Sequence, residues 1–244
     1  LLANPDVDRW IPGGNQSVIL PMRYILPDAD RTGIVLNVAE MRLYFYPSPE
    51  LATEVQSYPV SIGRMDWSTP LGVTKVSAKT TRPSWRPPAS IRAEASAQGE
   101  YLPAVIPPGP DNPLGNFAMR LAIPGYLIHS TNKPYGVGMR VTHGCIRMYP
   151  EDIAGLFPQI PVGTPVRIVN QAIKLGWLVD TLFIEIHPPL EEFANKVDEK
   201  NAAMDLVNAK WEQRPFKLDV QALNHAIAKR SGMPVAIAKI TNKP

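Results

Sequence analysis

Residues 129–147 read HSTNKPYGVGMRVTHGCIR and contain the only cysteine of the chain, Cys145, with two of its four histidines, His129 and His143. An imidazole can make a nearby thiol nucleophilic by removing its proton, because a free thiol with a pKa of about 8.5 is mostly protonated at neutral pH. Gly144 lets the backbone turn sharply, so amides near it can face a developing oxyanion. The segment therefore predicts a nucleophilic cysteine site.

Two other uses of these side chains were weighed against catalysis. A lone cysteine is most often a small buried hydrophobe, although the neighbours of Cys145 argue for chemistry. Metal binding needs more ligands than the segment offers, since it has no second cysteine and no carboxylate before Glu151 and Asp152. We therefore predict neither a metal nor a cofactor.

The segment resembles the L,D-transpeptidase (YkuD-type) catalytic domain, whose signature is a His, a spacer, then Ser or Thr followed by His-Gly-Cys, an apolar residue and Asn or Arg. Every element occurs here in that order. The resemblance implies that Cys145 is the nucleophile, that His129 is the general base, and that the backbone carbonyl of Ser130 orients His129. It adds to the catalytic site His143 and Gly144, and to the substrate-binding site Thr142, Arg147, Tyr135 and Met139.

Strand geometry favours His129 over His143 as the base. Two residues along an extended chain rise roughly 6.5 Å with side chains pointing the same way, so His143 would lie beside Cys145. A residue on an adjacent strand can lie directly opposite, with Cβ atoms about 4.5 to 5.5 Å apart. We therefore expect His129 to face Cys145 across two strands, although Gly144 can distort the chain enough to bring His143 closer.

Arg147 has two interpretations that the sequence leaves open. It lies two residues after Cys145, on the same face if the backbone is extended. Its planar guanidinium can bind a substrate carboxylate, or it can pair with Glu151 or Asp152.

Length and composition fit one sizeable domain with an appendage. The chain has 244 residues, of which 45% are hydrophobic and 19% charged, and no apolar run approaches the length of a membrane span. A net charge of +3 suits an anionic polymer but is too weak to indicate nucleic acid, so no nucleic-acid partner is expected. The chain starts without an initiator Met or an apolar leader, so we expect a secreted protein whose signal peptide is removed.

Short β-branched and aromatic runs separated by turn signals predict a mainly β fold, a sandwich or barrel-like core. The expected strands cover residues 34–38, 41–46, 55–62, 72–78, 119–128 with a break at Pro124-Gly125, 163–169 and 177–186. Asn37, Leu43-Tyr44 and Thr69-Pro70-Leu71-Gly72 recur in the resembled family as scaffold. A short helix is expected at residues 152–157.

Residues 80–115 lose this periodicity and are rich in proline. The prolines, with Trp85 and Tyr101, favour a semi-rigid wall or lid over the site rather than plain disorder. The resembled family carries a substrate-capping element here, and residues 107–115 are similar to those of its enterobacterial-type members.

The sequence suggests three segments. Residues 1–27, with an apolar run at 18–21, resemble part of a glycan-binding LysM module, or form an ordinary strand and linker. Residues 28–172 are the expected L,D-transpeptidase domain. Residues 173–244 supply closing strands and a helical appendage: Phe193 to Trp211 has the spacing of one long amphipathic helix, and Asp219 can cap a second helix ending near Gly232.

The resemblance implies a cysteine L,D-transpeptidase that acts on peptidoglycan stem peptides in the periplasm. Cys145 would attack the carbonyl of diaminopimelate and release D-Ala, and an amine would resolve the acyl-enzyme. The acceptor most similar to the lipoprotein-anchoring branch is the C-terminal Lys of murein lipoprotein; the alternatives are 3-3 crosslinking of two stems and hydrolysis of the lipoprotein link. Carbapenem-type β-lactams are expected inhibitors.

Two other classes of protein, cysteine proteases and non-enzymatic glycan-binding scaffolds, fit the sequence less well. Papain-like proteases place Cys before His, and sortases separate His from Cys by far more positions than this chain does. A non-enzymatic glycan-binding scaffold would not need His129, Gly144 and Cys145 intact.

Overall fold

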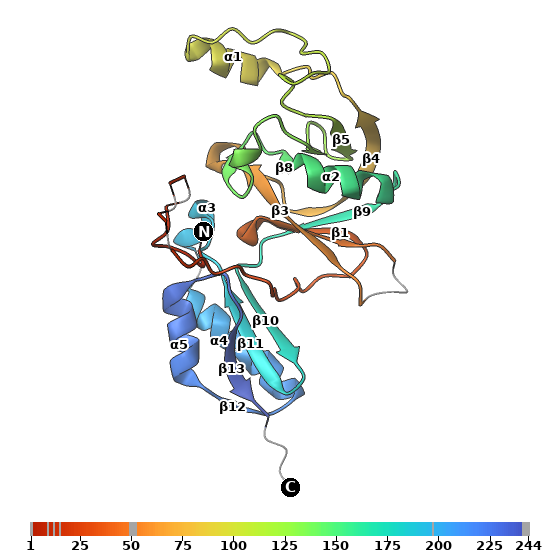
Figure 1. Cartoon of the computed structure of the whole chain (residues 1–244). Helices are drawn as coiled ribbons and strands as arrows, with labels where there is room; N and C mark the ends of the chain where they lie inside the picture. The colour runs from red at the N-terminus through yellow and green to blue at the C-terminus, as the bar shows by residue number, and fades with distance from the viewer. Residues whose placement is uncertain are drawn as a thin grey trace. The chain divides into compact units, whose positions relative to one another are not determined.

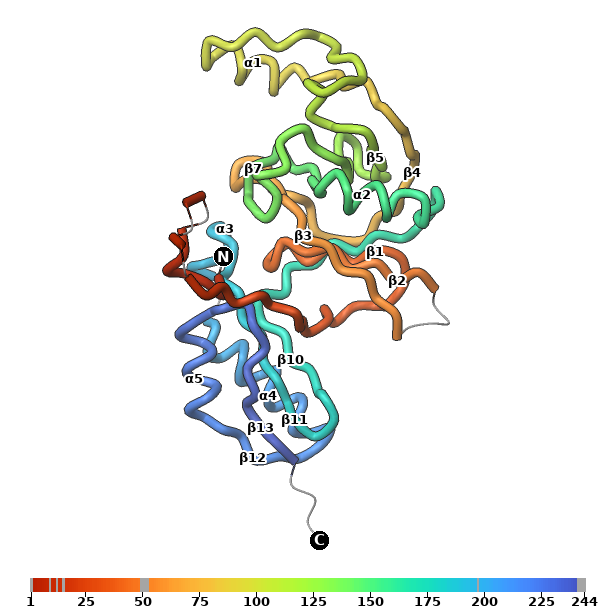
Figure 2. The backbone as a smooth tube through the Cα atoms, viewed as in Figure 1, coloured from red at the N-terminus to blue at the C-terminus, as the bar shows by residue number. Residues whose placement is uncertain are grey.

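The computed structural model describes residues 2–8, 10–11, 13–14, 16–48, 53–196 and 198–240. The chain forms two compact units (Figures 1 and 2). The catalytic unit comprises Ala29–Val169, and the terminal unit combines Leu1–Asp28 with Asn170–Pro244. The cysteine motif belongs to the catalytic unit.

The catalytic unit is built on nine strands in the described part of the chain. They are β1 (Gly33–Asn37), β2 (Arg42–Tyr46), β3 (Gln56–Gly63), β4 (Gly72–Thr81), β5 (Phe117–Leu121), β6 (Leu127–His129), β7 (Arg140–Thr142), β8 (Ile146–Met148) and β9 (Pro165–Val169). β1 and β2 form the expected hairpin, joined by the 3-10 turn η1 (Val38–Glu40) and by Met41 with φ 50°.

Strands β3 and β4 are each shared between two sheets. The first half of β4 pairs with β9 and its second half with β5, while β3 pairs first with β2 and then with β8. The neighbours therefore run β3-β2-β1-β9-β4 in one sheet and β4-β5-β6-β8-β3 in the other, which closes the set into a barrel-like sandwich. This confirms the predicted mainly β fold.

Apolar side chains fill the interior of this sandwich. The fully buried side chains come from several strands and from α2 (Pro150–Leu156), and they include Ile34, Leu36, Leu43, Tyr44, Val60, Ile62, Met119, Leu121, Ile128, Ile146, Met148 and Ile153. Because β6 and β8 are short and anchored by Ile128 and Ile146, the residues that follow His129 and precede Ile146 are held at a rigid sheet end.

The segment after β4 contains a helix that the sequence analysis did not predict. α1 (Ala89–Ala97) lies between the backbone pair Trp85–Ile106, whose amides donate to each other's carbonyls at 2.8 Å, and it contains no buried residue. Figures 1 and 2 show it in an arm of chain beyond the end of β4. The run Ala89-Ser-Ile-Arg-Ala-Glu-Ala-Ser-Ala is rich in helix formers, a signal that the neighbouring prolines masked.

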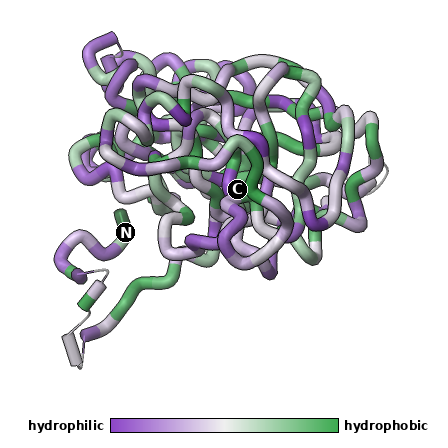
Figure 3. Tube along the Cα trace, turned by 90° about the horizontal axis from the view of Figure 1, so that it is seen from above, coloured by the Kyte–Doolittle hydropathy of each residue, from purple (hydrophilic) through white to green (hydrophobic). Residues whose placement is uncertain are grey.

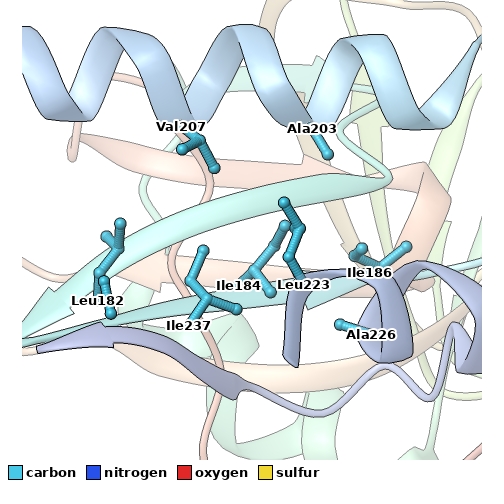
Figure 4. Packing of buried hydrophobic residues seen from close by; sticks show 9 residues of the cluster. Leu182, Ile184, Ile186, Ala203, Val207, Leu223, Ala226 and Ile237 are labelled. Atoms are coloured by element: carbon cyan, nitrogen blue, oxygen red, sulfur yellow. The ribbon is translucent and has the colours of Figure 1, made fainter. Parts of the chain in front are cut away.

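The terminal unit has a separate core. Strands β10 (Ile173–Leu178), β11 (Thr181–Ile186), β13 (Val235–Lys239) and β12 (Lys217–Leu218) pair in that order, and helices α4 (Glu199–Gln213) and α5 (Val220–Lys229) cover them. Figure 4 shows side chains of β11, α4, α5 and β13 meeting there: Leu182, Ile184, Ile186, Ala203, Val207, Leu223, Ala226 and Ile237. As predicted, Asp219 caps α5 by accepting from the Ala222 amide at 2.9 Å.

Two expectations for the terminal unit are wrong. Residues 193–211 do not form one helix: α3 (Glu191–Ala194) ends first, and Asp198 starts α4 by accepting from the Lys200 and Asn201 amides. The apolar spacing continues across this break, but Trp211 is half exposed and Val197 lies outside the described residues. Residues 18–21 form no strand, and Val18, Ile19 and Leu20 are exposed. Figure 3 shows a hydrophobic, green stretch in the trace of the N-terminal segment.

A buried ion cluster fastens the N-terminal segment to this small sheet. Glu185 Oε1 lies 2.9 Å from Lys174 Nζ and 2.7 Å from His187 Nε2, while Glu185 Oε2 accepts from the Ile25 amide at 2.6 Å. Lys174 Nζ also donates to the Ile25 carbonyl at 2.6 Å. His187, which directly follows β11, is thus part of a buried network. None of the helices among the described residues is long and apolar enough to cross a membrane.

Candidate active site

Parallel pairing of β6 with β8 brings the two ends of the motif together. Ile128 pairs with Ile146 and His129 pairs with Arg147, so Arg147, and not Cys145, lies directly opposite the imidazole. Cys145 precedes Arg147 by two residues and shares its face of the sheet. His129 and Cys145 are therefore diagonal neighbours, a separation of about 7–8 Å between backbones that side chains can bridge. The sequence predicted that His129 and Cys145 lie directly opposite each other. The observed register instead offsets them by two residues.

His129 is buried and its ring is held by its own chain. Its Nδ1 lies 2.5 Å from the Ser130 carbonyl. A carbonyl only accepts, so Nδ1 carries the hydrogen and Nε2 of the neutral ring is the acceptor. Burial, then the charge of Arg147, lowers the pKa of His129 to about 4, against the Ser130 hydrogen bond that raises it. At neutral pH the imidazole is therefore uncharged and able to take a proton.

Cys145 presents a half-buried thiol. Its Sγ lies 3.6 Å from the Gly125 carbonyl, and its own carbonyl accepts from Thr142 Oγ1 at 2.6 Å. Burial raises the pKa of the thiol, and the Leu127 backbone and the charge of Arg147 act in the opposite direction. The free thiol is therefore mostly protonated at neutral pH, so its use as a nucleophile calls for a base.

Gly144 occupies a corner that only glycine fits. Its φ is +94°, and a Cβ there would lie 2.6 Å from Tyr126 Cε1. Its carbonyl accepts from Thr69 Oγ1 at 2.9 Å, and Thr69 Oγ1 in turn accepts from the Gly63 amide at 3.0 Å. Thr69, predicted as scaffold, thus fixes the peptide next to the cysteine. Fixed amides at such a turn can stabilise an oxyanion.

Arg147 is a half-buried cation beside the thiol. Burial, then Glu151, raises the pKa of Asp152, and Arg42 acts in the opposite direction. Burial lowers the pKa of Arg147, and Cys145 and Tyr135 act in the opposite direction. Its Nε is buried and, within the part of the chain described, has no hydrogen-bond partner. This geometry favours the substrate-binding interpretation over a pair with Glu151 or Asp152.

The loop between β6 and β7 contributes less to the centre of the site. Tyr135 lies on the turn η3 (Pro134–Gly136) and is mostly exposed. Met139 contributes its backbone carbonyl, which accepts from the Ile62 amide at 3.3 Å. Among the described residues, no hydrogen bond or ring contact joins the Met139 side chain to Cys145.

His143 has partners that the sequence did not indicate. Its Nε2 lies 2.7 Å from Glu94 Oε2 of α1, and its ring meets Trp67 edge-on with centroids 5.2 Å apart. The other oxygen of Glu94 accepts from Arg64 NH2. A carboxylate within a proline-rich segment, far from the motif in sequence, gave no signal of this contact.

The site contains a neutral imidazole, a protonated thiol, a fixed glycine corner and a cation. Together these are the parts of an acyl-transfer site. Residues 31–168 match the YkuD family, the L,D-transpeptidase catalytic domain. The chain belongs to this family, and it is an L,D-transpeptidase that acts on peptidoglycan.

Curated relatives agree over nearly the whole chain. The chain is 42% identical to Probable L,D-transpeptidase YcfS of Escherichia coli over 98% of its length and 76% of the relative. It is 40% identical to Probable L,D-transpeptidase ErfK/SrfK of the same species, over 98% of this chain and 77% of that one. A solved L,D-transpeptidase from Mycobacterium smegmatis aligns with 57% of this chain and 58% of its own, at 22% identity and a TM-score of 0.44.

Proposed function

We propose that the enzyme forms an acyl-enzyme between Cys145 and the diaminopimelate residue of a tetrapeptide stem, and transfers this acyl group to an amine. His129 Nε2 takes the thiol proton as Sγ attacks the carbonyl carbon. The carbon–nitrogen bond to D-Ala then breaks, and the imidazolium returns the proton to the leaving amine.

The second half of the reaction uses the same groups. An incoming amine attacks the thioester carbon, His129 accepts its proton, and the carbon–sulfur bond breaks to restore the thiol. Amides at Gly144 and Cys145 stabilise the oxyanion of both tetrahedral intermediates. Arg147 binds a substrate carboxylate near the reacting carbonyl.

One observation carries this proposal: the buried His129 keeps a hydrogen on Nδ1 for the Ser130 carbonyl, which leaves Nε2 as the accepting nitrogen, and its pairing with Arg147 places it two positions from Cys145 in register. His143, by contrast, is engaged through Nε2 with Glu94. This difference supports His129 as the base.

The proposed acceptor is the C-terminal Lys of murein lipoprotein, and the proposed location is the periplasm, where this polymer and lipoprotein meet. Similarity over nearly the full chain to YcfS and ErfK/SrfK supports the proposal that this enzyme uses the same kind of acceptor as these relatives. The second candidates are 3-3 crosslinking of stems and hydrolysis of the lipoprotein link, which share the acyl-enzyme. A partial LysM-like role for residues 1–27 remains part of this proposal.

Intact-protein mass spectrometry after incubation with a tetrapeptide stem tests the acyl-enzyme. Wild type should gain the mass of the stem without D-Ala, and Cys145→Ala should gain nothing; an adduct on Cys145→Ala overturns the assignment. Adding lipoprotein, a second stem or neither separates the three outcomes by the mass of the product.

Thiol alkylation rates against pH test the base. His129→Ala should lose the enhanced rate near neutral pH and His143→Ala should keep it; the reverse result exchanges their roles.

A carbapenem should acylate the protein at Cys145, because its strained amide carbonyl presents the same electrophile. Peptide mapping that finds the adduct on another residue contradicts this.

A further inference from the structure

Arg64 and His143 come together at the ends of two parallel strands. β3 ends at Gly63 and β7 ends at Thr142, and these two residues are paired, so the residue after each strand lies at the same sheet end. The Arg64 amide donates to the Thr142 carbonyl at 3.0 Å. Two side chains that can carry positive charge thus sit side by side, and His143 is two residues from Cys145.

Each of these side chains also has a neighbour outside α1. Arg64 Nε lies 3.0 Å from Asp66 Oδ1, and the His143 ring rests against Trp67. The pair can accept a carboxylate between Arg64 Nη2 and His143 Nε2, a geometry in which one oxygen meets each donor.

Glu94 now fills that position from the arm. Its Oε1 accepts from Arg64 and its Oε2 from His143, and these hydrogen bonds, with Arg64 the larger influence, lower its pKa. All three side chains are about a quarter to a third exposed. Ion pairs of this exposure are weak and exchange readily with other ions.

The arm itself has little else to hold it there. No residue from 88 to 105 is buried, and the segment is closed at its base by the Trp85–Ile106 backbone pair. Asn112 strengthens that base by donating to the Pro83 carbonyl at 2.8 Å. α1 can therefore move away from Arg64 and His143 while the base of the arm stays folded.

We propose that Arg64 and His143 form a carboxylate subsite for the peptidoglycan stem peptide, and that Glu94 occupies this subsite in the free enzyme. The inference rests on the proposed function, because the ligand is the stem peptide itself. Such a stem carries carboxylates on diaminopimelate and on the terminal D-Ala. One of them replaces Glu94, and α1 is displaced from the cation pair when substrate enters.

Binding, rather than turnover, tests the subsite, so the measurements use a Cys145→Ala background. Titration calorimetry compares a free-acid tetrapeptide stem with two analogues, one amidated at D-Ala and one at the diaminopimelate carboxylate. Arg64→Gln should weaken binding of the free acid about tenfold, and should leave the affinity of one of the analogues unchanged. Glu94→Gln removes the internal competitor and should tighten binding of the free acid severalfold.

Arg92→Gln is the matched control, because Arg92 is an exposed arginine on the same helix. It should alter none of the affinities. The proposal is overturned if Arg64→Gln weakens all three peptides equally, if Glu94→Gln weakens the free acid, or if none of the peptides binds. Should Arg64→Gln fail to fold, Glu94→Gln on the exposed helix decides alone.

The outcome is separable from that of the proposed function. An absence of acyl-enzyme on the wild-type protein refutes the chemistry at Cys145, whereas the affinities above report only on Arg64, His143 and Glu94.

Discussion

Arg147 lies directly opposite His129 in the parallel pairing of β6 with β8, and its charge lowers the pKa of both His129 and Cys145. The same cation thus keeps the imidazole free of a proton and eases ionisation of the thiol.

The acid limit of catalysis should lie well below the usual range of histidine. Burial, and then Arg147, holds the pKa of His129 at about 4, so the base stays unprotonated until the pH approaches that value. The rate of carbapenem acylation, followed from pH 3.5 to 8, should therefore fall by half near pH 4. Arg147→Gln should move this limb to higher pH. A wild-type limb near 6.5 contradicts the prediction.

Stability should depend on the same group. The folded pKa of His129, about 4, lies below its unfolded value of 6.5, so the unfolded chain binds more protons between these values. The contribution is present above pH 6.5 and is lost as the pH falls toward 4, amounting to about 3 kcal/mol. Urea unfolding of wild type and His129→Gln at pH 7 and 4.5 measures it; equal losses in both proteins would refute it.

Gly144→Ala should impair acylation far more than it impairs folding. The added Cβ meets Tyr126 at 2.6 Å and shifts the amides proposed to hold the oxyanion, so we expect a loss of about 100-fold in rate. Gly138→Ala is the control, since Gly138 has a similar φ of +84° but nothing within 4 Å of the added carbon. Equal rate losses in the two variants would attribute the effect to backbone strain alone.

Thr69→Val should reduce both stability and acylation rate. It removes the hydroxyl that joins the Gly63 amide to the Gly144 carbonyl, leaving two buried groups unpaired at a cost of about 2 kcal/mol. Thr164→Val, which removes a donor to the Pro161 carbonyl away from the motif, should lower stability without changing the rate. Urea unfolding and carbapenem acylation of each variant distinguish the two effects, and a rate loss in Thr164→Val would count against a local role for Thr69.

Glu185→Gln should destabilise the terminal unit by about 3 kcal/mol, because it leaves the buried Lys174 without its counter-charge. Burial raises the pKa of Glu185, but His187 and Lys174 outweigh it and the net pKa is lowered. This contribution is thus present above the unfolded pKa and is lost as the pH falls through the folded one. Asp180→Asn, at an exposed pair with Arg214, should change stability little. Denaturation of each variant, followed by tryptophan fluorescence, measures these changes in stability. Equal stability of Glu185→Gln and wild type would contradict the prediction.

Much of the catalytic unit follows from local pattern. β-Branched and aromatic runs separated by turn signals predicted β1 to β4, and the residue types from His129 to Arg147 predicted the motif, because both are read from neighbours in sequence. The register that places Arg147 opposite His129 depends on which strands meet, and no local signal specifies this. Glu94 was missed for the same reason: it reaches His143 only through the arm.

The start of α4 had a local signal in the capping side chain of Asp198, whereas the buried network of the terminal unit had none. The spacing of Phe193 and Val207 suits one helix, but Asp198 makes a better start than a continuation, since its side chain binds two amides. Lys174, Glu185 and His187 are ordinary strand residues by pattern, and only their shared burial with Ile25 makes them a network.

The clasp between Ile25 and Glu185 also orders events during synthesis. A ribosome releases the N-terminal segment long before residue 185 exists, so this segment must wait while the whole of Ala29–Val169 emerges. The inserted unit has all its strands available first and can fold on its own, whereas the small sheet must pair with a segment that precedes the inserted unit in sequence. During synthesis the sandwich should therefore form first, and the hydrogen bond between the Ile25 amide and Glu185 should form last.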